Sequence, residues 1–103
     1  MTYRVRVQGV FDGLTEDQRT ELLAELPTLT SGGFSPEGGL VYDSALRAFT
    51  FRYELDLPED ATERLACTEA TALATARLQA RGYGHRALRA SAVDMSQIKI
   101  RRR

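Results

Sequence analysis

Cysteine, histidine and asparagine are scarce in this sequence of 103 residues, which has one Cys, one His and no Asn. The single cysteine, Cys67, excludes a disulfide within the chain, so a reducing compartment, the cytoplasm, is expected. Cys67 and the one histidine, His85, are too few to form a zinc site. The sequence therefore predicts no metal and no other cofactor.

Long apolar runs are missing as well. No stretch reaches the roughly 18 apolar residues that a membrane-spanning helix needs, so no association with membranes is expected. The first residues enter an alternating strand pattern, which we interpret as leaving no room for a signal peptide. The chain is 43% hydrophobic and 27% charged, an ordinary globular balance. We expect one domain over residues 1–96 and a basic tail over residues 97–103.

The net charge is zero, yet the charges are unevenly distributed. Residues 1–80 carry seven Arg against thirteen Asp and Glu, whereas residues 81–103 carry six Arg and one Lys against a single Asp. This asymmetry is compatible with an anionic partner. It is equally compatible with a basic end that lies against an acidic body, within one molecule or between two copies.

Strand and helix signals alternate along the chain. Residues 3–8 and 49–55 alternate apolar with polar side chains, as half-buried strands do, and shorter strands are predicted at 40–42 and 87–93. Two capping boxes predict where helices begin. Thr15 with Gln18 marks the first helix, and Asp60 with Glu63 marks a second helix over residues 61–81.

The order strand, helix, strand, strand, helix, strand predicts an α+β domain of ferredoxin-like βαββαβ type. In this fold a four-stranded antiparallel sheet has two helices on one face and leaves the other face open. The strand phases assign to the helix side Val5, Val7, Phe49, Phe51, Tyr53, Leu88 and Ala90. The open side receives Arg4, Arg6, Gln8, Thr50, Arg52, Glu54, Arg89 and Ser91.

Residues 7–11, Val-Gln-Gly-Val-Phe, resemble the first loop of acylphosphatases, which share this element order and size. The resemblance implies an arginine two residues later, to hold the acyl phosphate, and an asparagine that places the attacking water. Gly13 occupies the arginine position, and the sequence contains no asparagine. The acidic residues Asp12, Glu16 and Asp17 would also repel a phosphate at the helix N-terminus. The resemblance thus supports the fold and argues against the activity.

A second resemblance covers nearly the whole chain. It rests on five segments: Phe11-Asp12-Gly13-Leu14-Thr15, Ser35-Pro36-Glu37-Gly38, Phe49-Thr50-Phe51-Arg52-Tyr53, Arg81-Gly82-Tyr83-Gly84 and Asp94-Met95-Ser96-Gln97. Together they resemble a bacterial family of small actinobacterial proteins of unknown function. The resemblance implies no activity, substrate or catalytic residue.

Residues 47–53, Arg-Ala-Phe-Thr-Phe-Arg-Tyr, superficially fit the third-strand motif of RNA-recognition domains. That motif needs its aromatic side chains on the open face, where they stack on bases. If Phe49 and Phe51 faced outward, Arg52 would be buried as an unpaired charge. We therefore expect no tight binding of nucleic acid.

Four arginines of the open face, Arg4, Arg6, Arg52 and Arg89, are the candidate anion-binding or interface residues. One interpretation is a solvated sheet face on which Glu54 and Asp56 are their partners. The other interpretation is a functional face, covered by an anionic ligand or by a second subunit.

Glu69 and His85 are the candidate acid–base groups. Glu69 falls near the middle of the apolar side that we predict for the second helix, which is formed by Leu65, Ala72, Leu73 and Ala76. A buried carboxylate there would have a raised pKa, whereas a rolled helix would bring Glu69 to the edge. His85 could exchange protons, yet a single loop histidine is more often a surface residue.

The tail carries Ile98 and Ile100, which alternate with Lys99 and Arg101 as in a strand. Because these isoleucines have no evident place in their own core, we expect the interface tail Ile98, Lys99 and Ile100 to contact a second copy in a homodimer. Two functions remain open. One is a non-catalytic binding or interaction protein. The other is a small cofactor-independent enzyme or small-molecule binder with a cleft formed by the sheet face, the tail or the dimer partner.

Overall fold

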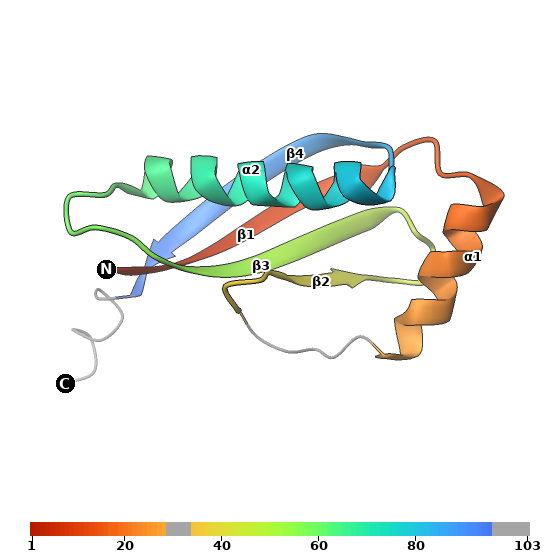
Figure 1. The fold of residues 1–103 in the computed structure, drawn as a ribbon, viewed down its shortest axis with the longest axis horizontal. Coiled ribbons are helices and arrows are strands. Elements are labelled where there is room, and N and C mark those ends of the chain that lie inside the picture. Colours follow the sequence, from red (N-terminus) through yellow and green to blue (C-terminus); the bar gives the residue numbers. More distant parts are fainter. Residues whose placement is uncertain (29–33, 96–103) are drawn as a thin grey trace.

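The computed structural model describes residues 1–28 and 34–95. Its elements follow the order predicted from the sequence (Figure 1): β1 (Thr2–Phe11), α1 (Glu16–Glu25), a 3₁₀ turn (Leu26–Thr28), β2 (Gly39–Tyr42), β3 (Ala48–Asp56), α2 (Glu63–Arg81) and β4 (His85–Asp94). The strands form one antiparallel sheet in the order β2-β3-β1-β4. This is the α+β ferredoxin-like arrangement. The predicted tail, residues 97–103, lies outside the described residues.

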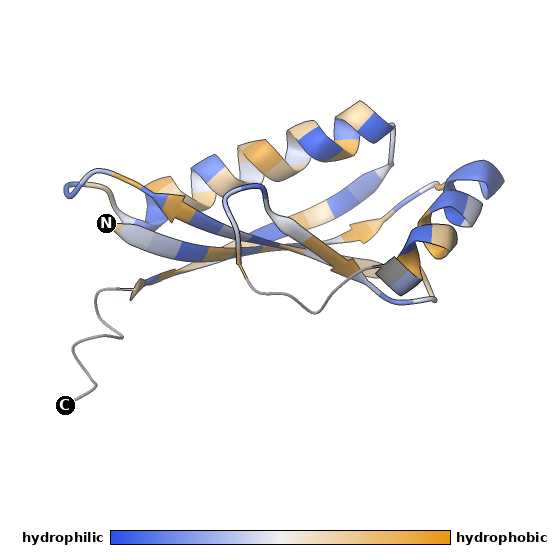
Figure 2. Ribbon diagram, turned by 60° about the horizontal axis from the view of Figure 1, so that its bottom comes forward, coloured by the Kyte–Doolittle hydropathy of each residue, from blue (hydrophilic) through white to orange (hydrophobic). Residues whose placement is uncertain are grey.

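The two faces of the sheet differ as the strand phases predict. The hydropathy colours alternate along the strands, and α2 lies over one face only (Figure 2). On that side Val5, Val7 and the aromatic row Phe49, Phe51 and Tyr53 are almost fully buried. Their side chains share one core with α2, because a pleated strand sends alternate residues to opposite faces. The aromatic residues of β3 are therefore not available for stacking on bases.

Helix α2 buries a different side from the predicted one. Its buried residues recur every fourth position, at Ala66, Ala70, Ala74 and Leu78. Leu65 and Leu73, which we assigned to the core, are 40% and 41% exposed. Small side chains at the buried positions allow the helix backbone to lie close to the sheet, mainly over β1 and β4. The side centred on Glu69 therefore faces outward, and the opposite side, which includes Leu78, is buried.

Both helix starts depend on a threonine. The first capping box is confirmed: the Thr15 hydroxyl accepts from the amide of Gln18, whose side chain accepts from the amide of Thr15. The second prediction is wrong by two residues, because Thr62 and not Asp60 caps α2 by accepting from the amide of Leu65. The acidic side chain of Glu63 then lies in the first helical turn, where the helix dipole favours it.

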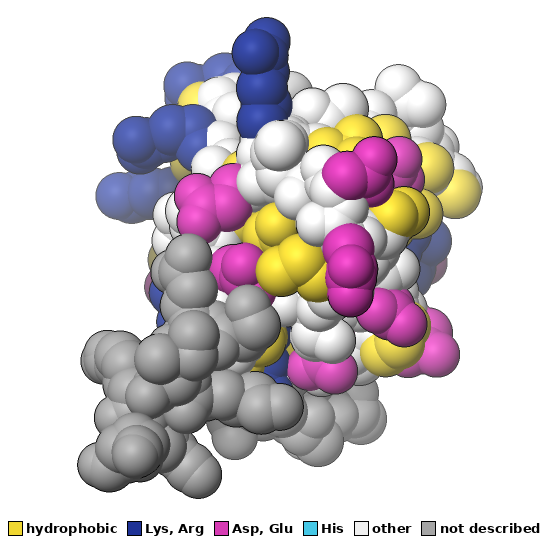
Figure 3. All heavy atoms as spheres, turned by 90° about the vertical axis from the view of Figure 1, so that its left-hand side faces the viewer, with side chains coloured by type: hydrophobic (Ala, Val, Ile, Leu, Met, Phe, Trp, Pro, Cys, Tyr) yellow, Lys and Arg dark blue, Asp and Glu magenta, His cyan; other side chains and the backbone are white. Residues whose placement is uncertain are grey.

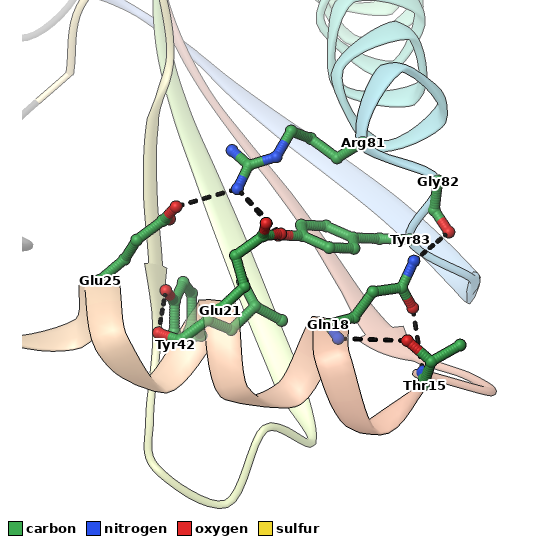
Figure 4. Close-up of polar contacts among 9 residues, drawn as sticks. Thr15, Gln18, Glu21, Glu25, Tyr42, Arg81, Gly82 and Tyr83 are labelled. Carbon is green, nitrogen blue, oxygen red and sulfur yellow. Dashed lines mark hydrogen bonds and ion pairs between the residues drawn. The ribbon is translucent and has the colours of Figure 1, made fainter.

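Helix α1 lies across the end of the sheet farthest from the N-terminus, steeply inclined to α2 (Figure 1). Its one buried residue, Leu22, enters the same core. Polar contacts complete the attachment. The Tyr42 hydroxyl donates to the carbonyl oxygen of Leu22 at 2.7 Å, and the Gln18 side chain donates to that of Gly82 at 2.9 Å (Figure 4). None of the helices in the described residues is long and apolar enough to cross a membrane.

Candidate functional site

The open-face arginines lie on neighbouring strands, as the register requires. Arg6 of β1 is directly opposite Arg52 of β3, and Arg4 is opposite Glu54. Arg89 of β4 is opposite Gln8, which follows Arg6 as the next residue of β1 on this face. The structure thus brings the four predicted arginines onto one surface across three strands. Like charges opposite each other destabilise a sheet, so the pairing of Arg6 with Arg52 carries a cost.

The arginines differ in their partners. The Arg4 guanidinium forms an ion pair with Glu54, at 3.1 Å between Nε and Oε1. Arg6 has no carboxylate within ion-pair distance among residues 1–28 and 34–95. The positive charge of Arg6 is therefore one that an added anion would neutralise.

An aromatic side chain lies against these arginines. The ring centroid of Phe34 is 5.3 Å from the Arg4 guanidinium carbon and 5.7 Å from that of Arg6. The next residue, Ser35, anchors this segment to the edge of β3, because its carbonyl oxygen accepts from the amide of Glu54 at 2.9 Å. The ring therefore forms a wall on the open face, held by cation–π contacts with both arginines.

A half-open cavity of about 190 Å³ adjoins the Phe34 wall. Its lining combines two cations, one hydroxyl and three apolar side chains: Arg4, Arg6, Ser91, Phe34, Val93 and Met95. Val93, an apolar residue on the same face as the arginines, is 45% exposed. We call this cavity and its lining the open-face site.

Sequence reasoning found the arginines of the open-face site and missed its apolar half. Val93 follows Arg89 and Ser91 at the same two-residue spacing, so the strand phase alone places it on the open side. An apolar residue at that position was the available signal. The position of Phe34 had no comparable signal, because it depends on a loop that crosses the sheet edge.

A second surface, at the left-hand end of the molecule in Figure 1, is acidic. Figure 3 shows carboxylates gathered there, and the exposed acidic residues where β3 continues into α2 are Asp56, Glu59, Asp60 and Glu63. The Asp56 carboxylate also lies 3.5 Å from the N-terminal ammonium. The folded domain thus has a basic sheet face and an acidic end. This division differs from the one along the sequence, because Arg4, Arg6 and Arg52 belong to its acidic part, residues 1–80.

The most perturbed titratable cluster joins α1 to the end of α2 (Figure 4). The Tyr83 hydroxyl donates to Glu21 at 2.8 Å and accepts from Arg81 at 2.9 Å, while Arg81 also donates to Glu25 at 2.9 Å. Burial, reinforced by the bond to Glu21, raises the pKa of Tyr83 to about 12. The hydrogen bonds from Tyr83 and Arg81 lower the pKa of Glu21. Since these polar groups bind one another, we interpret the cluster as a structural link that attaches α1 to the end of α2.

The comparisons with known proteins bear on this geometry. The sequence pattern of a family of unknown function, DUF6204, matches residues 1–103. The chain belongs to this family. No curated protein and no solved structure matches the chain. Family membership confirms the predicted resemblance to a family of unknown function. It assigns no activity, so the function must be argued from the residues.

The candidate acid–base residues lie away from the open-face site. Glu69 is exposed on the outer side of α2, which settles its burial in favour of the rolled helix. His85 begins β4 opposite Phe11, and its Nδ1 atom lies 3.1 Å from the carbonyl oxygen of Tyr83. The two residues therefore do not form a pair with each other or with the arginine cavity.

Nucleophiles and metal ligands offer little further chemistry. Burial, with a smaller contribution from Glu63, raises the pKa of the Cys67 thiol, which disfavours the reactive thiolate. No group of three or more His, Cys, Asp or Glu side chains that could hold a metal ion occurs in the described part of the chain. The arrangement on the open face is suited to binding an anion.

Proposed function

We propose that the protein is a non-catalytic binding protein whose working surface is the open face of its sheet. The observation that carries this proposal is the position of Phe34, whose ring lies against both Arg4 and Arg6 and forms the wall of a cavity. Convergent polar groups in a largely apolar concavity are typical of small-molecule sites. Binding is favoured over catalysis because Glu69, His85 and Cys67 are not part of this lining.

Charge argues against the alternative in which a second copy covers this face. A two-fold interface brings the same patch together from both copies. Arg6 and Arg89 would then lie near the arginines of the other copy, with Glu54 already paired to Arg4. A small anionic ligand at Arg6 avoids this repulsion.

The proposal is tested by screening small fragments of positive, negative and neutral charge with backbone-amide NMR. We expect the compounds that bind to shift the amides of residues 4–6 and 91–93. Compounds whose shifts map only to other surfaces, or the absence of any binder at millimolar concentration, would overturn the proposal. Arg47→Gln provides the matched control for the loss of Arg6. Arg47 is exposed at the end of β3 away from the open-face site, and its loss removes one positive charge, as the loss of Arg6 does.

We also propose that the protein forms a homodimer, and the outer side of α2 is the surface that supports this. Between residues 65 and 76 the helix has a single charged side chain, Glu69, although this side is exposed. An exposed helix face is normally polar, and one that is not is a candidate for burial. The symmetric partner would cover Leu65 and Leu73.

Size exclusion with light scattering tests the dimer at tens of micromolar. The double variant Leu65→Glu/Leu73→Glu should be monomeric, whereas Leu23→Glu, at a leucine of α1 with similar exposure, should remain dimeric. A monomeric wild-type protein would refute the homodimer. Loss of the dimer on deletion of residues 97–103, with the helix variants still dimeric, would assign the interface to the predicted tail instead.

The cytoplasm of a bacterial cell is the proposed location. A single cysteine whose thiol is kept protonated by burial is compatible with a reducing environment. Tight binding of nucleic acid remains unexpected, because the aromatic row of β3 is buried on the helix side and cannot stack on bases.

A further inference from the structure

We propose that the ligand of the open-face site is a small monocarboxylate with an apolar body, of about the size of benzoate or hexanoate. This inference rests on the proposed function and adds the chemical class of the ligand. It follows from three properties of the site: the location of its unneutralised charge, the nature of its walls, and its volume.

The carboxylate is assigned to Arg6. Arg4 already has a carboxylate partner in Glu54, whereas Arg6 has none in the described residues and lies against the π face of Phe34. A guanidinium that holds an aromatic ring on one side can still direct N–H donors at a carboxylate in its plane. Ser91, directly opposite Arg6 on β4, adds a hydroxyl donor at the same level of the sheet. One free guanidinium suits a single negative charge.

The apolar body is assigned to the other half of the cavity. Phe34, Val93 and Met95 are the apolar residues of its lining, and Val93 leaves 45% of its surface to solvent. Covering such surface is favourable, whereas a purely inorganic anion would leave it wet. The walls therefore select an anion that carries hydrocarbon over inorganic phosphate.

The volume restricts the size of the ligand. A cavity of about 190 Å³ corresponds to roughly six water molecules at liquid density. Sites for drug-sized ligands usually begin at about 300 Å³. A nucleotide or a peptide would extend far outside this cavity, while a ring or short chain with one carboxylate fits within it.

The experiment is an amide-detected NMR titration of the full chain with benzoate, hexanoate, their neutral amides benzamide and hexanamide, and inorganic phosphate. We expect both carboxylates to shift the amides of residues 4–6 and 91–93 in a saturable way. The neutral amides should bind at least about tenfold more weakly, because a charge-assisted hydrogen bond is replaced by a neutral one. Phosphate should produce no saturable shift at these residues.

Two variants locate the two halves of the ligand. Arg6→Gln should weaken both carboxylates about tenfold or more while leaving the weak amides unchanged, and Arg47→Gln should change neither. Val93→Thr keeps the shape of the side chain and adds a hydroxyl. This variant should weaken the binding of hexanoate several-fold, while hexanoate still binds more tightly than its neutral amide.

Failure of this inference and failure of the proposed function give different results. If amides or cationic compounds bind the open-face site as tightly as carboxylates, the face binds ligands but the assigned class is wrong. If phosphate binds as tightly as benzoate, the apolar half has no role and the inference is overturned. If no probe or screened fragment shifts residues 4–6 or 91–93, both proposals fail together.

Discussion

Neighbouring residues of one strand have opposite roles in this protein. Val5 is fully buried beneath α2, while Arg6 projects from the other face into the open-face site. The helix side of the sheet consists of aromatic, aliphatic and alanine side chains that exclude water, and it accounts for the fold. The open side carries an arginine opposite an arginine, which stability alone would not select. The comparison indicates that stability and binding are divided between the two faces.

The largest effect is expected from truncation in the aromatic row. Phe51→Ala should lower the free energy of unfolding by about 3–5 kcal/mol, because it removes a buried ring and leaves a cavity beside Phe49 and Tyr53. Urea denaturation measures this. Thr50→Ala, at the adjacent open-face position, should change stability by no more than about 0.5 kcal/mol. Equal losses in the two variants would contradict the division between the faces.

A smaller loss is expected at Gly38, where the loop meets the helix side. A Cβ atom added there would lie 2.2 Å from the Tyr53 ring, and the backbone has φ +85. Gly38→Ala should therefore cost roughly 2 kcal/mol or more, from strain and overpacking together. Gly13→Ala is the matched control, since it has φ +75 and nothing within 4 Å of its added Cβ. The difference between the urea denaturation midpoints of the two variants isolates the effect of the contact with Tyr53.

Alkaline pH should also act through the helix side. The pKa of Tyr83 is about 12 in the folded protein against 10 for an ordinary tyrosine. Between these values the unfolded chain loses the proton while the folded protein keeps it, so stability is full below pH 10 and falls as pH rises toward 12. Tyr83→Phe should have a shallower decline in its urea midpoint above pH 10.

That variant should also be less stable near neutral pH, because it loses the hydrogen bond to Glu21. The decline will not vanish entirely, since burial also raises the pKa of Tyr3, Tyr42 and Tyr53. An unchanged slope in Tyr83→Phe would show that this phenol does not contribute to the alkaline transition.

The smallest effect on stability is expected at the residue most important for binding. Arg6→Gln should leave the free energy of unfolding within about 0.5 kcal/mol of wild type, although it removes the cation–π contact with Phe34. The reason is that the substitution relieves the like-charge pair with Arg52. Thermal and urea denaturation measure it alongside ligand affinity. A loss above 1 kcal/mol would mean that Arg6 supports the fold, and the division between the faces would be wrong.

The sheet was predictable because strand periodicity is a local property. Alternation along residues 3–8 and 49–55 was sufficient to assign Val5 and Phe51 to the core and Arg6 and Arg52 to the open face. The cap at Thr15 was predictable for the same reason, since its hydrogen bonds span only three residues. The second cap was not, because Asp60 and Thr62 both have side chains that can cap a helix, and only the structure identifies Thr62 as the cap.

The sequence by itself determined the order of the elements, the two faces of each strand and the presence of arginines on the open face. Only the tertiary structure decided the rotation of α2, because a helix rich in alanine and leucine has apolar residues on both sides. Packing against the sheet buries the side with the small residues Ala66, Ala70 and Ala74. Only the tertiary structure placed Phe34 over Arg4 and Arg6. This contact joins the loop before β2 to β1, some thirty residues earlier, and it depends on the hydrogen bond that attaches the loop to β3. Periodicity reports what one element prefers, whereas a site formed between elements depends on how their surfaces meet.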